Sequence, residues 1–486
     1  MKSLNIRVVV LAMLALGVAS SAWAQTDEEH FATFPFNFSN PGARAAGMGG
    51  AFIGIANDAS SAISNPAGLT NMLQKQIYIE GKGVSTPFGH LQFNDSLLTG
   101  YGEVAKNTTG GITFFNVVMP WKHNLSFGAS YNQFLHYSDS FTYSPRRIVS
   151  YSQSLLPGVT SDFNYVGRTF AGTVGYKVAE NFRIGGSMSI NRVSGTLNAA
   201  RTPVSYGTGT INYQSTKMDA SDYSFGYNVG MLYEPIQDTL FLGLTYNDIG
   251  ASKLEESLGS ATRQVTFNTP RRVGFGASWK TMAKRVVIAF DAIHVYYDDL
   301  AKETTVLLYN DMAGIQSAIG PLPVQVAPIT NAGAGTSNRF SIDNGTEYRG
   351  GVEVKLIQGA KPLFFRYGLF RLPVHNLRYP VGANSLGGIY TDAAGGKHGE
   401  NVYYPDQVIE QVLWVTERAV LGNRVLGANG YQLDTSKPTY YLGNADIGWS
   451  LGAGWIVGNY QFDVAYTRSA YQRSEFIASA AIRFGK

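Results

Sequence analysis

The chain of 486 residues contains no cysteine, which excludes a disulfide framework and thiolate metal sites. Charged residues make up only 15%, well below the roughly 25% of ordinary soluble domains. No run reaches the roughly 18 apolar residues that a membrane-spanning helix needs, so a helical membrane protein is excluded. With 38 basic and 34 acidic residues, the charge is nearly balanced and indicates no nucleic-acid partner.

The first 24 residues have the features of a secretory signal peptide. Lys2 and Arg7 form a positive start, 8–18 is an apolar core, and Ala22-Trp23-Ala24 fits the small-x-small cleavage rule. We therefore expect residues 1–24 to be removed and the mature protein to be exported. Gln25 rather than cysteine follows the predicted cut, so no lipid anchor is indicated.

The residues in excess are glycine (55), tyrosine (29) and phenylalanine (27), a mixture typical of strands, tight turns and aromatic girdles. In residues 223–233 every second side chain is aromatic or aliphatic, and those between are mostly small or polar. The same alternation recurs at 240–246, 273–279 and 460–466. Period two predicts strands with one apolar and one polar face, which suits a barrel with lipid outside and a polar lumen.

About fourteen strands can be placed, with approximate limits 76–84, 111–119, 125–143, 165–178, 182–198, 222–233, 239–247, 271–280, 285–297, 346–357, 362–372, 444–457, 460–470 and 472–484. Short links alternate with longer ones, of which 298–345 and 373–443 are the longest. Outer-membrane barrels have short periplasmic turns and long outer loops. We therefore predict an all-β fold, a transmembrane antiparallel β-barrel of about 14 strands over residues 76–486, in a Gram-negative type of outer membrane.

Residues 25–75 do not alternate and form a predicted plug, or hatch, inside the lumen. Gly47, Gly49 and Gly50 would let the backbone pass close to the surrounding wall. Asp58 is a candidate N-cap of a short helix, and Asn65 before Pro66 is another. The glycine cluster is not a nucleotide-binding loop, because it lacks the Gly-Lys-Ser/Thr ending and follows no strand.

The run GARAAGMGGAFIGIANDASSAISNPAGLTNM at 42–72 resembles the N-terminal hatch of the FadL/TodX family. Its triplet Asn65-Pro66-Ala67 matches the Asn-Pro-Ala hatch motif of that family. The resemblance implies a fourteen-stranded outer-membrane transporter of long-chain fatty acids or other hydrophobic compounds. It also implies a hatch that shifts and an exit sideways through the barrel wall. The longest outer loops lie late in this chain, which departs from the better-known members.

Catalysis is the weaker interpretation of the polar residues. His136 and Ser138 lie two apart in a predicted strand with Asn132 expected on the same face, and outer membrane phospholipase A resembles this arrangement. Serine and asparagine are common in barrel strands, however, and no nucleophile elbow or acidic helper stands nearby. The other histidines show no metal-ligand spacing, and Asp291 and His294 are expected to face opposite sides of one strand. We therefore expect no enzyme, no metal and no cofactor.

Charged residues of the predicted lumen are candidate ligand sites. If 358–361 is a tight turn, Glu353 lies opposite Arg366, and an ion pair is favoured over a ligand headgroup site. Arg349 and Lys355 share that face and leave positive charge that a fatty acid carboxylate could use. The residues expected to bind ligand are the charged Arg349, Lys355 and Arg366 with the hatch aromatics Phe31, Phe34, Phe36 and Phe38.

The two longest loops are unusually apolar for outer loops, at 306–309, 315–326 and 408–421. Such residues either pack on each other or gather a hydrophobic ligand. The function predicted is passive uptake of hydrophobic compounds such as long-chain fatty acids or aromatic hydrocarbons, by a monomer surrounded by outer-membrane lipids and lipopolysaccharide. The alternative is a secretion-associated barrel of similar fold that binds protein partners at the cell surface.

Overall fold

The computed structural model describes residues 36, 38–87, 93–94, 98–100, 106–121, 124–143, 146–148, 154–156, 159–201, 204–206, 209–211, 215–258, 261–281, 283–301, 341–342, 344–373, 377–378, 446–469 and 473–485. The predicted signal peptide, Phe31, Phe34 and most of the loops 298–345 and 373–443 lie outside these residues. Among the described residues, no helix has the length and apolarity to cross a membrane.

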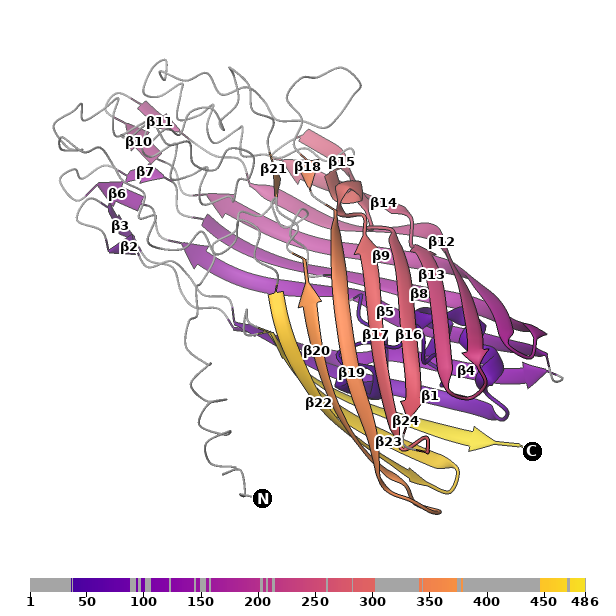
Figure 1. The fold of residues 1–486 in the computed structure, drawn as a ribbon. Coiled ribbons are helices and arrows are strands. Elements are labelled where there is room, and N and C mark those ends of the chain that lie inside the picture. The colour runs from indigo at the N-terminus through magenta and orange to yellow at the C-terminus, as the bar shows by residue number, and fades with distance from the viewer. Residues whose placement is uncertain are drawn as a thin grey trace, which may run out of the picture.

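Fourteen antiparallel strands form a closed ring, in which each strand pairs with its neighbours in chain order and the last pairs with the first (Figure 1). They are β1 (Lys75–Pro87), β4 (Lys106–Trp121), β5 (Leu125–Tyr143), β8 (Val159–Ala179), β9 (Phe182–Arg201), β12 (Thr216–Ile236), β13 (Leu240–Asp248), β16 (Arg272–Thr281), β17 (Val286–Val295), β19 (Gly345–Ile357), β20 (Leu363–Leu372), β22 (Asp446–Val457), β23 (Tyr460–Ser469) and β24 (Ser474–Phe484). The predicted barrel of fourteen strands is confirmed.

The remaining strands lie at the ends of the barrel strands opposite the short turns. A hairpin of β14 (Ala251–Leu258) and β15 (Ala261–Asn268) pairs onto the start of β12. The sequence predicted only a link there, because these residues carry little apolar alternation. The short strands pair in small sheets: β2 (Phe93–Asn94), β3 (Leu98–Gly100), β6 (Arg146–Ile148), β7 (Ser154–Leu156), β10 (Val204–Tyr206), β11 (Gly209–Ile211), β18 (Ser341–Ile342) and β21 (Leu377–Arg378).

The two faces of the wall differ as the alternation predicts. Large apolar side chains are exposed on the outward face, among them Phe170, Met188 and Phe225. The inward side chains between them are mostly small, polar or charged and are buried. Aromatic residues beside the short turns are exposed outward, as an interfacial belt requires: Trp121, Tyr233, Trp279, Trp455 and Tyr460.

Residues 38–74, here called the N-terminal segment, lie inside the ring. They contain the short helices α3 (Ala43–Gly47) and α4 (Ser61–Ser64) and the 3-10 helix η1 (Pro66–Asn71). The segment hydrogen-bonds to inward side chains of strands all round the ring, such as Asn116, Asn228, Ser278 and Ser450. Figure 1 shows these helices surrounded by the strands.

The wall is incomplete between β4 and β5. Their ladder runs from the short turn to the pair Phe114–Asn132 and stops there. Beyond this pair β4 continues to Lys106 against β1 alone, and β5 continues to Tyr143 against β8 alone. The two flanking ladders each have a bulge at this level. In the β1–β4 ladder it lies beside Gly81, and in the β5–β8 ladder it lies between Gln133 and Leu135. The described backbones of β4 and β5 are therefore not paired with each other in the half of this junction that lies away from their short turn, here called the upper half.

Candidate functional site

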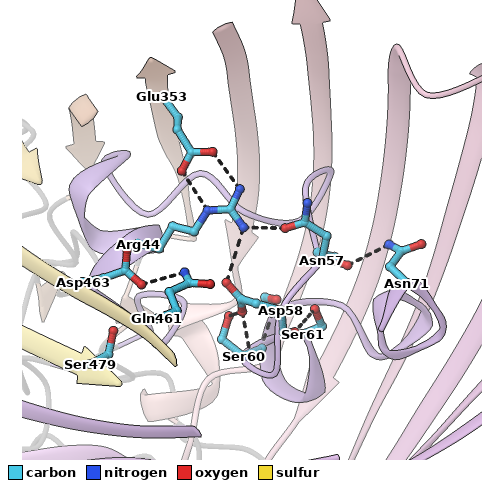
Figure 2. Close-up of polar contacts among 12 residues, drawn as sticks. Arg44, Asn57, Asp58, Ser60, Ser61, Asn71, Glu353, Gln461, Asp463 and Ser479 are labelled. Carbon is cyan, nitrogen blue, oxygen red and sulfur yellow. Dashed lines mark hydrogen bonds and ion pairs between the residues drawn. The ribbon is translucent and has the colours of Figure 1, made fainter. Parts of the chain in front are cut away.

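Arg44 of helix α3 forms an ion pair between the N-terminal segment and the wall. Its guanidinium donates from Nε and Nη2 to the two carboxylate oxygens of Glu353 on β19, at 2.8 Å each. Its Nη1 donates to Asn57 Oδ1 at 2.6 Å and lies 3.6 Å from Asp58 Oδ2. Figure 2 shows Arg44 between these groups. The side chain thus joins two parts of the segment to the barrel.

The charges continue along the wall from Glu353. Its Oε2 also accepts from Arg366 Nε at 2.6 Å, so the predicted pairing of Glu353 with Arg366 is confirmed. Arg366 donates from Nη1 to Asp463 Oδ1 at 2.8 Å, and Gln461 donates to the other oxygen of Asp463 at 2.7 Å. All these wall residues are buried. Positive and negative side chains therefore alternate in one hydrogen-bonded row. Each charge has a partner of opposite sign, which offsets the cost of burying it.

These contacts and burial determine the pKa shifts of Arg44 and Asp58, the two charged residues of the segment at this place. Burial opposes the charge of Arg44, yet the Glu353 carboxylate outweighs burial and raises the pKa of Arg44 above its ordinary value. Burial raises the pKa of Asp58, and the nearby Arg44 offsets only part of that rise. Arg44 therefore stays charged, whereas Asp58 is a carboxylate held in an unfavourable environment.

Two further wall contacts hold the backbone of the segment. Asp291 of β17 accepts the N–H groups of Phe52 and Ile53 through Oδ2, at 2.7 and 2.9 Å. Asp291 is fully buried and faces inward, while His294 binds Thr346 on the opposite face, as the spacing predicted. Sequence reasoning gave Asp291 no role, because its partners are backbone groups more than 200 residues away in the chain.

Asn65 anchors the predicted hatch motif. Its side-chain oxygen accepts from Ala67 N, so Asn65 caps η1 with Pro66 at the first position, and the predicted cap is confirmed. Its amide also donates to the carbonyls of Ile53 and Met231 at 3.1 and 2.9 Å. Asn65 thereby ties the segment to itself and to β12.

Asp58 is not the N-cap of α4, which the sequence predicted. The N-cap is Ser60, and Asp58 accepts from the N–H and hydroxyl of Ser60 at 2.9 and 2.6 Å. Asp58 therefore forms an Asx-type turn with Ser60, just before α4 begins at Ser61.

The glycine cluster lies flat against the wall, as predicted. Gly49 has a φ of 69°, and a Cβ added there would lie 2.6 Å from Leu369 O and 2.8 Å from Gly350 O. Gly47 would meet the Cα of Gly452 at 3.0 Å. The N-H of Gly49 donates to Ser450 Oγ at 2.9 Å. A side chain at Gly49 would push the segment off β19 and β20.

The three charged residues predicted to bind ligand do not form one site. Arg349 is neutralised by Glu347, at 2.7 Å, and reaches Gly49 O and Ser39 Oγ of the segment. Since Arg349 is paired, it does not supply the spare positive charge that the sequence suggested. Arg366 is paired as described above. Lys355 lies near the short turn, with its Nζ 5.8 Å from the centre of the Phe364 ring.

Phe36 and Phe38 lie together at the start of the described segment. Their rings stack at 4.9 Å, and Phe36 also stacks on Phe267 of β15 at 5.8 Å. The guanidinium of Arg272 on β16 lies 4.3 Å from the centre of the Phe38 ring. Arg272 donates to Phe38 O and Asn247 Oδ1, at 3.2 and 2.8 Å.

Arg272 differs from the other lumen arginines. Its Nε has no hydrogen-bond partner among the described residues, and no described carboxylate lies within ion-pair distance. Sequence reasoning did not single it out. The only available signal was its place within residues 269–276, a run that opens a strand and resembles the FadL/TodX family more weakly than the hatch does.

The residues considered for hydrolysis do not converge. Asn132 pairs with Thr169, whereas His136 pairs with Val166, so the two lie on opposite faces of β5. The expectation that Asn132 shares the face of His136 is wrong, because the bulge between Gln133 and Leu135 reverses the alternation. No hydrogen bond joins His136 and Ser138 in the described part of the chain.

A closed barrel with an apolar outer band and a polypeptide segment held inside defines an outer-membrane transport barrel. A family model described as outer membrane protein transport protein (OMPP1/FadL/TodX) matches residues 30–283, just over half of the chain. The chain belongs to this family, whose members are outer-membrane transporters of hydrophobic compounds and not enzymes. No curated protein sequence matches the chain.

Solved structures share the fold at low sequence identity. A Pseudomonas aeruginosa FadL homologue is 13% identical, with a TM-score of 0.56 over 93% of this chain and 100% of its own. The Ralstonia pickettii toluene transporter TbuX is 12% identical, with a TM-score of 0.53 over 92% and 100%. The Pseudomonas putida toluene transporter TodX is 13% identical, with a TM-score of 0.51 over 92% and 100%.

Proposed function

We propose that this barrel takes up long-chain fatty acids by passive diffusion, with residues 25–75 as the hatch. The observation that carries this choice of substrate is Arg272, which lies beside stacked aromatic rings and has no carboxylate within ion-pair distance among the described residues. A fatty acid combines one carboxylate with a long apolar chain, and this site offers a partner for each part.

The carboxylate would bind to Arg272. Its present acceptors are two neutral oxygens, and a charge-assisted bond to a carboxylate is roughly twice as strong as a neutral one. Arg349 and Arg366 are poorer candidates, because Glu347, Glu353 and Asp463 already neutralise them. Lys355 is also set aside, since it lies at the level of the short turn between β19 and β20.

The acyl chain would pack on the aromatic rings of Phe36, Phe38 and Phe267. Burial of apolar surface stabilises the complex by roughly 25 cal/mol per Å². Phe31 and Phe34 precede this cluster in the sequence and stay predicted contacts.

Ligand bound at this cluster could loosen the hatch through the backbone next to it. Ser39 follows Phe38 and lies 3.4 Å from Arg349, which also binds Gly49 O. A shift of Phe38 toward ligand would strain this contact. The unpaired upper half of the β4–β5 junction supports a lateral exit at that place.

The substrate test is competition binding of a fluorescent long-chain fatty acid to the purified barrel in detergent. We expect Arg272→Gln to weaken fatty acid binding about tenfold or more, the loss of one charged hydrogen bond. The matched control is Arg271→Gln, which removes the same charge at a side chain already paired with Asp299 at 2.9 Å. Equal binding by wild type and Arg272→Gln would refute the assignment of the carboxylate site.

Aromatic hydrocarbons are the second candidate substrate, since two of the similar structures are toluene transporters. Toluene has no carboxylate, so it should bind wild type and Arg272→Gln equally. Displacement of the fluorescent probe by toluene at lower concentration than by fatty acids would favour this candidate. No saturable binding of either class would favour the secretion-associated barrel with protein partners.

The lateral exit has a separate test. The chain has no native cysteine, so cysteines at Ile112 and His136 can be joined by a short bismaleimide across the unpaired junction. Uptake into cells should fall while ligand binding stays unchanged. The control joins Val117 and Ala129, which are partners in the intact ladder, and should leave uptake unchanged. Unchanged uptake with the first crosslink would exclude this exit.

A further inference from the structure

Two arginines lie directly opposite each other on the outward face of the barrel. Arg168 of β8 and Arg192 of β9 are cross-strand partners (Figure 1 shows the two strands side by side). Arg168 shares its face with Phe170 and Arg192 shares its face with Ile190, and these two apolar side chains are 54% and 48% exposed. Both arginines therefore point away from the lumen.

This pairing is unfavourable for the protein alone. Like charges directly opposite each other in a ladder destabilise it. No described carboxylate lies within ion-pair distance of either guanidinium, and Arg192 Nε has no hydrogen-bond partner among the described residues. The other contacts of Arg192 are one hydrogen bond to Ser221 Oγ at 3.3 Å and the Tyr223 ring at 5.8 Å. Within the described part of the chain, the two cations therefore lack an anion.

The position of the pair indicates which anion is available. The row of outward residues next to it, toward the short turns, is Tyr131, Phe170, Ile190 and Phe225. From Phe170 to Val178, at the short turn, the strand advances about 26 Å, or about 20 Å along the barrel axis at a tilt of about 40°. Since the apolar band of such barrels is about 25 Å tall, Arg168 and Arg192 lie where it ends on the outer side.

We infer that Arg168 and Arg192 form a binding site for the phosphate group of a phosphorylated lipid in the outer leaflet. Two guanidinium groups side by side can hold one phosphate through bidentate hydrogen bonds and remove their mutual repulsion. The acyl chains of the same lipid would lie along Phe170, Ile190 and Phe225. A free phosphate ion would use the arginines but leave these apolar side chains without a partner.

Native mass spectrometry of the purified full barrel with bis-phosphorylated lipid A tests this site. Arg168→Gln with Arg192→Gln should lower lipid A affinity about 25-fold, taking about fivefold for each charge at a membrane surface. The matched control is Arg371→Gln on β20, an exposed outward arginine whose cross-strand partners are Tyr348 and Ile447. It should retain wild-type binding. Heat-modifiable migration on gels verifies that each variant is folded.

Two further arms use the wild-type protein and do not depend on folding of a variant. Lipid A without phosphates should bind about as weakly as phosphorylated lipid A binds the double variant. Inorganic phosphate at the same concentration should not displace lipid A. Equal binding of the dephosphorylated lipid, displacement by free phosphate, or full binding by the double variant would each overturn the proposal.

Discussion

Arg44 and Glu353 form a two-point ion pair between the N-terminal segment and strand β19, although 309 residues separate them in the chain. Both oxygens of Glu353 are used, and one of them also binds Arg366. Because Glu353 is buried, its charge depends on these two arginines. The position of the segment and the charge balance of the wall are therefore coupled at a single carboxylate.

Replacing Arg44 by alanine should release the segment without unfolding the barrel. The change leaves Glu353 and Asp58 short of a partner, and breaking a buried ion pair costs about 3 to 5 kcal/mol. The ladders of the fourteen strands do not involve Arg44. We expect higher conductance in planar bilayers and faster proteolysis within 38–74, with normal heat-modifiable migration.

Arg44→Lys is the graded control for that experiment. Lysine keeps the charge but cannot make the two parallel hydrogen bonds to Glu353. Conductance should lie between wild type and Arg44→Ala. If Arg44→Ala conducts like wild type, other contacts hold the segment and the ion pair is dispensable.

Docking of the segment should depend on pH through Asp58. Burial raises the pKa of Asp58 in the folded protein above its ordinary value of 3.8. Its contribution to docking is therefore fully present below about 3.8 and is lost as pH rises through the raised pKa. Asp58→Asn, which keeps an acceptor for Ser60, should remove this dependence and dock at least as well at pH 7. Conductance measured from pH 4 to 8 checks it; an unchanged slope in the variant contradicts it.

Gly49→Ala should also open the barrel, by a steric route. The new Cβ would lie 2.6 Å from Leu369 O, and the left-handed backbone adds about 1 to 2 kcal/mol of strain. Gly359→Ala is the matched control, because Gly359 also has a positive φ but a Cβ there meets nothing within 4 Å. Only Gly49→Ala should raise conductance. Equal effects of the two variants would show that strain alone, without contact to the wall, accounts for the change.

The barrel could be predicted from the sequence because apolar and polar side chains alternate within each strand, and this pattern is local. The pairing of Glu353 with Arg366 was predictable too, since a tight turn fixes the register of the two strands it joins. Bulges could not be predicted, and the one beside Leu135 places Asn132 and His136 on opposite faces of β5, although the sequence predicted that they share one.

The contacts of the N-terminal segment were beyond sequence reasoning for a different reason. Neither Asp291 nor Arg272 has a local pattern that marks its contact with the N-terminal segment, because Phe52, Ile53 and Phe38 lie more than 230 residues away. The motif Asn65-Pro66-Ala67 was recognisable because its capping contact is local. Its second role, the hydrogen bond to Met231 O, again depends on the closed barrel.

Deleting residues 25–39 should weaken fatty acid binding and leave the barrel folded. The deletion removes Phe36 and Phe38 from the stack on Phe267, while Asn40 keeps its hydrogen bond to Gly50 O at 2.8 Å. Loss of even one buried phenylalanine contact, about 1.5 to 3 kcal/mol, predicts more than a tenfold lower affinity.

The double variant Phe36→Ala and Phe38→Ala should reproduce most of that loss in the same competition assay. It is the sharper test, because the chain keeps its length and Ser39 keeps its contact with Arg349. Tighter binding by either protein would mean that the two rings occupy the ligand site and compete with fatty acid. In that case Arg272 would still bind the carboxylate, and the acyl chain would take the place of the rings.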